Sequence, residues 1–382
     1  MKGSIQKRGK ASWRLKFDLL PGPDGRRRSQ FVTVRGTKKD AQAKLAALLA
    51  AVGVGRYVEP NRITIAEHVE ARIAQWHAAG DISNRTAENY RKSLAHISLG
   101  IGETSLQRLS TLDIERWHGN LKAVGLASRT ITHAHRLLGK ALGDAVRHGL
   151  LVRNVAGREG QRAPKRTDVK EARVLKADEI AGFVEKLRGH PIFPAAMVAL
   201  FCGLRAGEVL ALRWSSIQGT MLEVSASIEE LDGEPPTLKA PKTAAGTRRV
   251  SMPAIVIDAL RHHRHQQLEL RLALGLGKLP DGALIFPAAT GEPQRPSYLS
   301  VQWIRARSAL GLPPLRYHDL RHTHASQLIA SGLDIVLISK RLGHASPAVT
   351  LQVYSHMFAT DDSKAADAIN RALGANPVPK NA

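Results

Sequence analysis

Residues 318–326 of the chain read HDLRHTHAS, and this stretch decides how the rest of the sequence is interpreted. Its surroundings predict a helix over 318–331. Residues three apart in a helix lie on one face, so His318 and Arg321 are expected to project side by side. A guanidinium binds a phosphate through fixed N–H donors, and an imidazole beside it can donate to that phosphate or move a proton.

Two further motifs accompany this stretch. Upstream, residues 203–208 read GLRAGE, within a helix predicted over 191–213. Downstream, residues 342–344 read LGH, and Tyr354 follows ten residues after His344. The order along the chain is therefore an arginine, a His-x-x-Arg pair, a Gly-His pair and a tyrosine.

The charge balance of the 382-residue chain points to a polyanionic partner. Lys and Arg number 56 against 33 for Asp and Glu, which gives a formal net charge of +23. Phosphates neutralised by such a surface release counterions, so nucleic acid is favoured; the alternative is a heavily charged solvated surface. The single cysteine, Cys202, excludes a disulfide framework and fits a reducing compartment. No apolar run reaches the length of a membrane span, so a soluble intracellular protein without a membrane partner is expected.

Length and pattern predict a mainly helical α+β protein of two or three domains with small β-sheets. Strands are expected over 2–8, 13–17 and 31–34, followed by a helix over 38–52 with Thr37 as its cap. The sheet is rich in basic side chains, which either face the major groove of DNA or are simply solvated. The candidates for DNA contact in this segment are Arg14, Lys16, Arg26, Arg27 and Arg28.

A helical block is predicted after a linker over 53–61. Thr64 and Glu67 have the spacing of a capping box at its start. Further helices are expected over 86–97, 112–124 and 128–148. The basic residues that we expect to contact DNA phosphates in this block are Arg85, Arg91 and Lys92. Residues 156–173 are polar and basic and predict a second linker.

The remainder of the chain is predicted to mix helices with short strands. Alternating apolar residues predict a strand over 222–228. Residues 238–243 and 248–252 are predicted to form a hairpin. Helices are expected over 176–188, 254–275, 298–310, 334–342, 347–357 and 361–373. The tail over 374–382 is expected to be loose.

The arginine, His-x-x-Arg, Gly-His and tyrosine motifs together resemble the tyrosine recombinase, or phage integrase, family. They span Arg205 to Tyr354, and the general layout resembles the family over nearly the whole chain. The resemblance implies a catalytic set made of Arg205, Lys242, His318, Arg321, His344 and Tyr354. It also implies that Glu208, one helical turn after Arg205, orients that arginine and supports the site.

These residue types fit the breaking and rejoining of DNA. A tyrosine oxygen can store a phosphodiester bond as an ester, so Tyr354 would be the nucleophile that forms a 3′-phosphotyrosyl intermediate. Arg205 and Arg321 would hold the non-bridging oxygens of the phosphate, and no metal or other cofactor is needed. By resemblance, Lys242 would protonate the leaving 5′ oxygen, with Lys239 as a nearby competitor.

The resemblance also implies a domain plan. An N-terminal arm-type DNA-binding domain would span 1–56, a helical core-binding domain 61–155 and a mixed α/β catalytic domain 172–373. The partners would be double-stranded DNA attachment sites held by a homotetramer, with accessory DNA-bending or directionality proteins as further candidates. Such a protein would integrate or excise a phage or other mobile element in the bacterial cytoplasm, in association with the nucleoid. Asn154 precedes Val155 where the family often has proline, a departure that touches nothing catalytic.

Other interpretations stay open. Tyr354 alone would more commonly be a packed aromatic residue, and Arg205 with Glu208 an ordinary helix ion pair. The histidines at 318, 322 and 324, and those at 262, 263 and 265, raise a metal site, which no accompanying carboxylate or cysteine spacing supports. A type IB topoisomerase shares the arginine, lysine and tyrosine chemistry, and a non-catalytic DNA-binding protein could share the fold.

Overall fold

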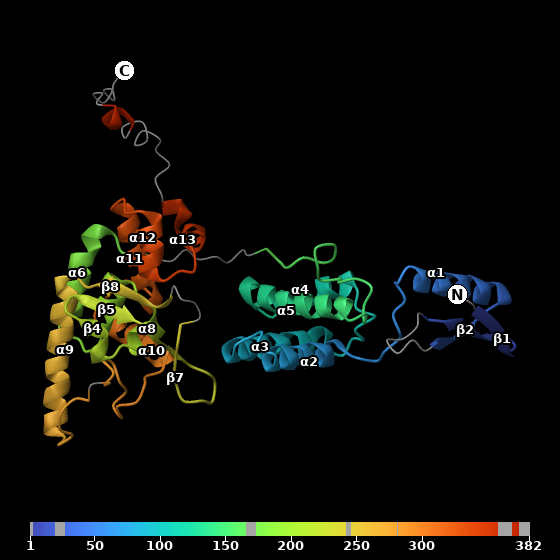
Figure 1. Ribbon diagram of the computed structural model, residues 1–382, viewed down its shortest axis with the longest axis horizontal. Coiled ribbons are helices and arrows are strands. Elements are labelled where there is room, and N and C mark those ends of the chain that lie inside the picture. The colour runs from blue at the N-terminus through green and yellow to red at the C-terminus, as the bar shows by residue number, and fades with distance from the viewer. Residues whose placement is uncertain are drawn as a thin grey trace. The chain divides into compact units, whose positions relative to one another are not determined.

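The computed structural model describes residues 3–19, 27–165, 173–241, 246–280, 282–357 and 369–373. It divides into two compact units, residues 1–169 and 170–382. Most of the described residues lie in helices, and their strands form small antiparallel sheets (Figure 1). The predicted mainly helical α+β class is confirmed. Every described helix is too short or too polar to pass through a lipid bilayer.

The first unit begins with the predicted three-stranded sheet and helix. Its elements are β1 (Gly3–Gly9), β2 (Ser12–Asp18), β3 (Ser29–Arg35) and α1 (Lys38–Gly53), and the strands pair antiparallel in that order. Helix α1 starts at the predicted cap, where the Thr37 hydroxyl accepts from the Asp40 N–H. Leu15 and Phe17 are fully buried in a core shared with α1. Lys16 points to the opposite face of the sheet and is exposed, because successive side chains of a strand alternate between faces.

Four helices with their own apolar core follow in the first unit. They are α2 (Ile65–Ala78), α3 (Asn84–Ile101), α4 (Thr111–Ala123) and α5 (Ser128–Arg147). The predicted capping box is present: the Thr64 hydroxyl accepts from the Glu67 N–H, and the Glu67 carboxylate accepts from the Thr64 N–H. Trp76, Trp117 and Leu137 are buried in the shared core. The predicted helices lie within these bounds to a few residues, because local periodicity and capping are enough to define them.

The second unit combines helices with two small sheets. Its helices are α6 (Ala177–Leu187), α7 (Phe193–Cys202), α8 (Ala206–Leu210), α9 (Ala254–Ala273), α10 (Pro296–Ala309), α11 (Tyr317–Ala330), α12 (Ile335–Leu342) and α13 (Pro347–Tyr354). Its strands are β4 (Ile217–Gln218), β5 (Met221–Val224) and β8 (Arg248–Ser251) in one sheet, and β6 (Ser227–Glu229) and β7 (Thr237–Lys239) in the other. Helix α7 is buried along most of its length and packs against α9 and α11, so it forms the centre of the core. Of the helix predicted over 361–373, residues 369–372 are described and are helical.

The helix predicted over 191–213 is interrupted, so the prediction of one continuous helix is wrong. Helix α7 ends at Cys202, and Gly203 adopts the left-handed conformation with φ +71°. A side chain at Gly203 would be strained there, and its Cβ would lie 2.5 Å from the His324 ring. The chain turns at this glycine, and Arg205 becomes the residue that precedes the short helix α8.

The predicted hairpin of residues 238–243 and 248–252 is also wrong. Strand β7 pairs with β6, and β8 pairs with β5, so the two segments belong to different sheets. The strand predicted over 222–228 is divided between β5 and β6 in the same way. Alternating apolar residues predict an extended chain and a buried face, but they do not identify the partner strand.

We expect Gly100 of α3 to resist substitution by alanine. Replacing glycine usually stabilises a helix by roughly 0.5–1 kcal/mol. At Gly100, however, the added Cβ would overlap the side chain of buried Trp117. Gly100→Ala should therefore lower the free energy of unfolding by about 1–3 kcal/mol, measured by urea denaturation.

The matched control is Gly119→Ala in α4, where nothing lies within 4 Å of the added Cβ. This variant should be neutral or stabilising. Equal effects of the two substitutions would contradict the packing argument.

Candidate active site

Arg321, on α11, lies at the centre of a polar cluster in the second unit. It is 2% exposed, and it donates from Nη1 to the Gly203 carbonyl at 2.5 Å and from Nη2 to the Leu342 carbonyl at 2.7 Å. Gly203 directly follows α7 and Leu342 ends α12. Both carbonyls are thus at C-terminal helix ends, where the helix dipole favours a cation. These bonds fix the direction of the guanidinium within the core.

Glu208, on α8, supplies the negative charge of this cluster. Its buried carboxylate accepts from the Arg205 N–H and Nη1, at 2.9 and 2.8 Å, and from Arg248 Nη2 at 2.9 Å. Its Oε2 lies 3.9 Å from Arg321 Nη1. Burial by itself would raise the pKa of Glu208, but the hydrogen bonds and charges of Arg248 and Arg205 lower it to about 2. One carboxylate therefore holds three guanidiniums together. The contact with Arg205 is the one that the motif predicts, and it is also the helix ion pair named as the alternative.

His344, just after α12, and His318, on α11 together with Arg321, both lie within range of the charges of Arg205 and Arg321. Burial, together with the charges of the nearby arginines, lowers the pKa of His344 to about 4. Its Nδ1 lies 2.8 Å from Thr350 Oγ1. His318 keeps an exposed side chain, and its pKa is lowered by partial burial and by the positive charges around it. Both imidazoles are therefore neutral at pH 7, and each can donate or accept a hydrogen bond.

Tyr354, the last residue of α13, is the remaining member of the cluster. It is 4% exposed and packs against apolar side chains of α11 and α12, which lie beside α13 (Figure 1). Its hydroxyl lies 2.7 Å from Nδ1 of His322. Burial raises the pKa of Tyr354 to about 12, against the opposing influence of Arg321 and Arg205. The phenol is therefore protonated at neutral pH and close enough to both arginines to feel their charges.

Of the two candidate lysines for the general acid, the structure describes only Lys239. Lys242 lies outside the described residues, so its position stays a prediction. Lys239, at the end of β7, donates to both carboxylate oxygens of Glu229, at 3.0 and 2.9 Å. A lysine held by a neighbouring carboxylate has its charge engaged within the protein, and this makes Lys239 the weaker candidate for a proton donor.

Sequence reasoning missed two members of the cluster. We considered His322 only as a metal ligand and Arg248 only as part of the predicted hairpin. Arg248 has 6% of its side chain exposed, and it donates from Nε to the Arg341 carbonyl at 2.7 Å as well as to Glu208. His322 directly follows Arg321, and Arg248 begins a predicted strand, but only contacts with distant parts of the chain distinguish either residue.

The histidine groups that raised a metal site take separate hydrogen-bond partners. His322 bonds to Tyr354, and His324 Nε2 accepts from Arg341 Nε at 3.0 Å. His263 bonds through Nε2 to the Ile285 carbonyl at 2.7 Å. Within the described part of the chain, no group of three or more His, Cys, Asp or Glu residues is arranged to hold a metal ion.

The residues predicted to contact DNA lie in the first unit, and several have acidic partners. The pairs are Arg27 with Asp18, Arg28 with Glu59, Arg85 and Lys92 with Glu88, and Arg91 with Glu70. Arg14 and Lys16 lie over the half-exposed ring of Phe31, 4.3 and 5.8 Å from its centroid. Arg26 lies outside the described residues. A DNA phosphate would have to compete with the carboxylates for the paired residues, whereas Arg14 and Lys16 form a basic and aromatic surface on the sheet.

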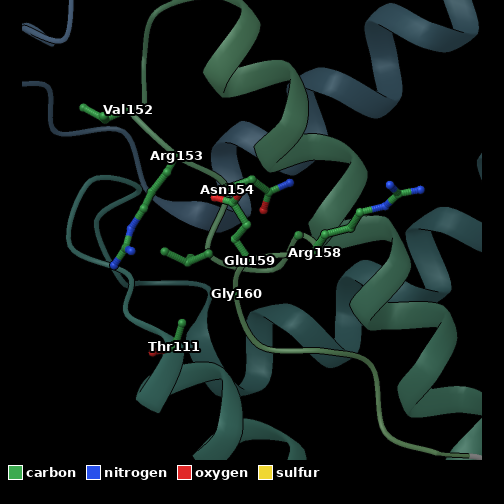
Figure 2. Close-up of a pocket in the computed structure, with 9 residues that line it drawn as sticks. Thr111, Val152, Arg153, Asn154, Arg158, Glu159 and Gly160 are labelled. Carbon is green, nitrogen blue, oxygen red and sulfur yellow. The ribbon is translucent and has the colours of Figure 1, made fainter.

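A surface pocket of about 330 Å³ lies in the first unit, beside the loop that follows α5 (Figure 2). Arg153, Asn154 and Arg158 line it from this loop, and Thr111 lines it from the start of α4. Asn154 is fixed by its side-chain amide, which donates to the Gly139 carbonyl at 2.7 Å. The lining includes none of the predicted catalytic residues. The chemistry therefore has to be sought in the cluster around Arg321.

The sequence profile of the phage integrase family matches residues 173–360, a range that contains every predicted catalytic residue. Residues 173–360 belong to this family. The predicted family and the predicted class of enzyme, a tyrosine recombinase, are confirmed.

Similar proteins cover most of this integrase-family chain. A tyrosine recombinase XerC-like protein of Caldanaerobacter subterraneus subsp. tengcongensis is 25% identical over 355 residues, which is 87% of this chain and 90% of the relative. The ICEBs1 integrase of Bacillus subtilis is 29% identical and covers 73% of this chain and 75% of its own. A solved structure of the Tn1549 transposon integrase with circular intermediate DNA has a TM-score of 0.67 at 18% identity, over 81% of this chain and 99% of that one. A lambda integrase tetramer bound to a Holliday junction has a TM-score of 0.55 at 18% identity, over 90% of this chain and 96% of that one. The two structures show that the fold is shared.

The charge of Glu208 should matter for stability in a pH-dependent way. Because the folded-state pKa is about 2, below the ordinary value of 4.5, the carboxylate contributes stability above pH 4.5 that is lost as the pH falls toward 2. Glu208→Gln should lower the free energy of unfolding by about 3 kcal/mol at pH 7, measured by urea denaturation. At pH 3 the difference from the wild type should be clearly smaller.

Glu223→Gln is the matched control, because Glu223 forms an exposed pair with Arg249 at 3.7 Å. Its effect should stay within about 0.5 kcal/mol at both pH values. A Glu208→Gln effect as small as that of Glu223→Gln, or one independent of pH, would rule out the charge-balancing role.

Proposed function

We propose that this chain is a site-specific DNA recombinase that cuts and rejoins strands through a bond between Tyr354 and a 3′ phosphate, and so integrates or excises a mobile element. The observation that carries the proposal is the position of Tyr354, which is hydrogen-bonded to His322 on α11 and lies within range of the charges of Arg321 and Arg205. A nucleophile beside two anchored guanidiniums is the arrangement that attack on a phosphodiester requires. Similarity to the ICEBs1 and Tn1549 integrases supports the assignment to a mobile element.

In this proposal the arginines bind the phosphate from two sides. The Arg205 guanidinium is held by a hydrogen bond to Glu208, and 41% of the side chain is exposed. A phosphate can therefore reach this guanidinium from the solvent. Arg321 uses two of its five N–H donors for helix-end carbonyls, which leaves others for a phosphate oxygen. Donors fixed before the substrate arrives stabilise the charge that develops during attack without reorganising. His318 and His344, both neutral, would add hydrogen bonds to the same phosphate.

The leaving 5′ oxygen needs a proton, and we assign this role to Lys242. The assignment rests on the motif position of Lys242 in the family and on the bidentate pair that Lys239 makes with Glu229. The Lys239 ammonium would first have to leave the Glu229 carboxylate before it could approach the leaving oxygen.

The domain plan and the partners complete the proposal. Residues 1–56 would bind arm-type DNA through the exposed face of the sheet, residues 61–155 would bind the core site, and residues 172–373 would carry the chemistry. The separate apolar cores of the sheet, the four helices and the second unit support such a division. A homotetramer on double-stranded attachment sites is the expected assembly, since lambda integrase has been seen as a tetramer on a Holliday junction. Accessory bending or directionality proteins would select the direction of exchange.

Tyr354→Phe should bind DNA like the wild type but form no covalent complex. The phenyl ring keeps the packing of Tyr354 and removes only the nucleophilic oxygen. Wild-type protein is incubated with a pool of nicked duplexes whose central sequence is randomised, and complexes that survive SDS are sequenced to give a cleaved duplex. Peptide mass mapping of the wild-type complex should find the DNA covalently attached to Tyr354. Gel retardation should show that the variant binds the same duplex with an affinity within about threefold of the wild type.

A covalent complex with Tyr354→Phe would show that another residue is the nucleophile. Wild-type protein that relaxes supercoiled plasmid but never exchanges strands between two sites would be a topoisomerase. Wild-type protein that binds the pool and never becomes covalent would be a DNA-binding protein without this activity.

Lys242→Ala should slow cleavage of the selected duplex by about 10²–10⁴-fold. A substrate with sulfur in place of the bridging 5′ oxygen has a leaving group that needs no proton, so it should restore the rate of this variant. Single-turnover covalent trapping measures both rates. Lys239→Ala should stay within a few-fold of the wild type on both substrates. Restoration by sulfur of Lys239→Ala instead would reassign the general acid to Lys239.

A further inference from the structure

His322, which is not a member of the predicted catalytic set, lies directly beside the nucleophile. It directly follows Arg321 on α11 and is half-buried. Its Nδ1 lies 2.7 Å from Tyr354 Oη, with the two ring centroids 5.6 Å apart. Among the residues that the structure describes, His322 is the only side chain hydrogen-bonded to this hydroxyl.

The other histidines of the cluster are engaged elsewhere. His344 uses Nδ1 for Thr350, and His324 uses Nε2 for Arg341. His318, for which the sequence allows either donation to the phosphate or movement of a proton, packs its ring edge-on against His322, with centroids 4.9 Å apart. His318 is thus one ring removed from the nucleophile and nearer the solvent, a position suited to the phosphate.

Building on the proposed function, we propose that His322 takes the proton of Tyr354 as its oxygen attacks the DNA phosphate, and returns that proton when the strand is rejoined. In the forward step the Oη–P bond forms, the P–O5′ bond breaks, and the phenol proton moves to Nδ1 of His322. The leaving 5′ oxygen takes its proton from a separate acid, for which Lys242 is proposed. In the reverse step a 5′ hydroxyl attacks and gives its proton to the deprotonated acid proposed at Lys242, the P–O5′ bond forms, the Oη–P bond breaks, and Oη recovers its proton from His322.

The protonation states of the two groups suit this transfer. Burial raises the pKa of Tyr354 to about 12, so the phenol keeps its proton at neutral pH and needs an acceptor at the moment of attack. Burial lowers the pKa of His322, so the ring is neutral and has a lone pair to accept with. The positive charge that forms on the ring would be stabilised by Asp319, whose carboxylate acts on His322 against the charges of Arg316 and Arg321.

A second reading of the same bond makes the opposite prediction. If the hydrogen bond only held Tyr354 in an inactive position, replacing His322 would release the tyrosine and speed up cleavage. If His322 accepts the proton, its removal slows cleavage even when the tyrosine is still held in place. The two roles therefore predict opposite changes in the cleavage rate when His322 is replaced.

The test compares His322→Asn and His322→Ala with the wild type in single-turnover trapping on the duplex selected above. The asparagine amide can occupy the place of Nδ1 and hydrogen-bond to Tyr354, but it cannot take a proton. Both variants should cleave about 10²–10⁴-fold more slowly than the wild type. Binding to the duplex and the thermal unfolding midpoint of His322→Asn should match those of His265→Asn, the same replacement at an exposed position of α9.

The substrate with a bridging 5′ sulfur distinguishes the acceptor from the donor. It removes the need for a general acid, so it should restore Lys242→Ala and leave His322→Asn slow. A positioning effect alone would be repaired by asparagine, so a His322→Asn rate close to the wild type would overturn the proposal. A rate above the wild type would show instead that the hydrogen bond holds Tyr354 in an inactive position, and restoration by sulfur would assign His322 to the leaving group.

These failures differ from failure of the proposed function. If the wild type forms no covalent complex with any duplex of the pool, the recombinase assignment falls and His322 falls with it. If the wild type becomes covalent at Tyr354 and His322→Asn matches it, only the role of His322 is lost.

Discussion

The carboxylate of Glu208 is the constraint on which the rest of the catalytic cluster depends. The buried Arg248 and Arg321 and the partly exposed Arg205 would repel one another, and Glu208 lies within contact of all three. The geometry is available because the chain turns at Gly203, between a helix that ends and a short helix that begins. At the same turn the Gly203 carbonyl accepts a hydrogen bond from Arg321. The break in the helix therefore both places Arg205 next to Glu208 and fixes the position of Arg321.

The positive charge of this cluster also affects the protonation state of its histidines. Positive neighbours and burial keep His318, His322 and His344 neutral, so they can act as donors and acceptors and do not add further charge. A phosphate entering the cluster would bring the negative charge that the arginines lack. Substrate binding and catalysis then depend on the same electrostatic imbalance, and the packing of α11, α12 and α13 holds Tyr354 beside the cluster.

In the first unit, by contrast, the predicted DNA-contacting side chains that the structure describes are mostly exposed or half-exposed. Many of its basic side chains are paired with carboxylates on the protein surface, and DNA would replace those partners with phosphates. Arg14 and Lys16 instead lie over an aromatic ring on one face of the sheet, while the other face is the core. Contacts of this sort position a protein on DNA, whereas base readout requires side chains that reach the groove.

The sequence by itself determined the elements whose cause is local. Capping at Thr37 and Thr64, the helical periodicity and the ordered motifs from Arg205 to Tyr354 were enough for the fold class, the family and the candidate residues. Tertiary structure alone decided the break at Gly203, the pairing of β7 with β6 and β8 with β5, and the contacts of Arg248 and His322. The reason is physical: Glu208 and Arg248 are 40 residues apart and His322 and Tyr354 are 32 apart, so no local pattern encodes their contact. A close approach of that kind exists only once the helices have packed.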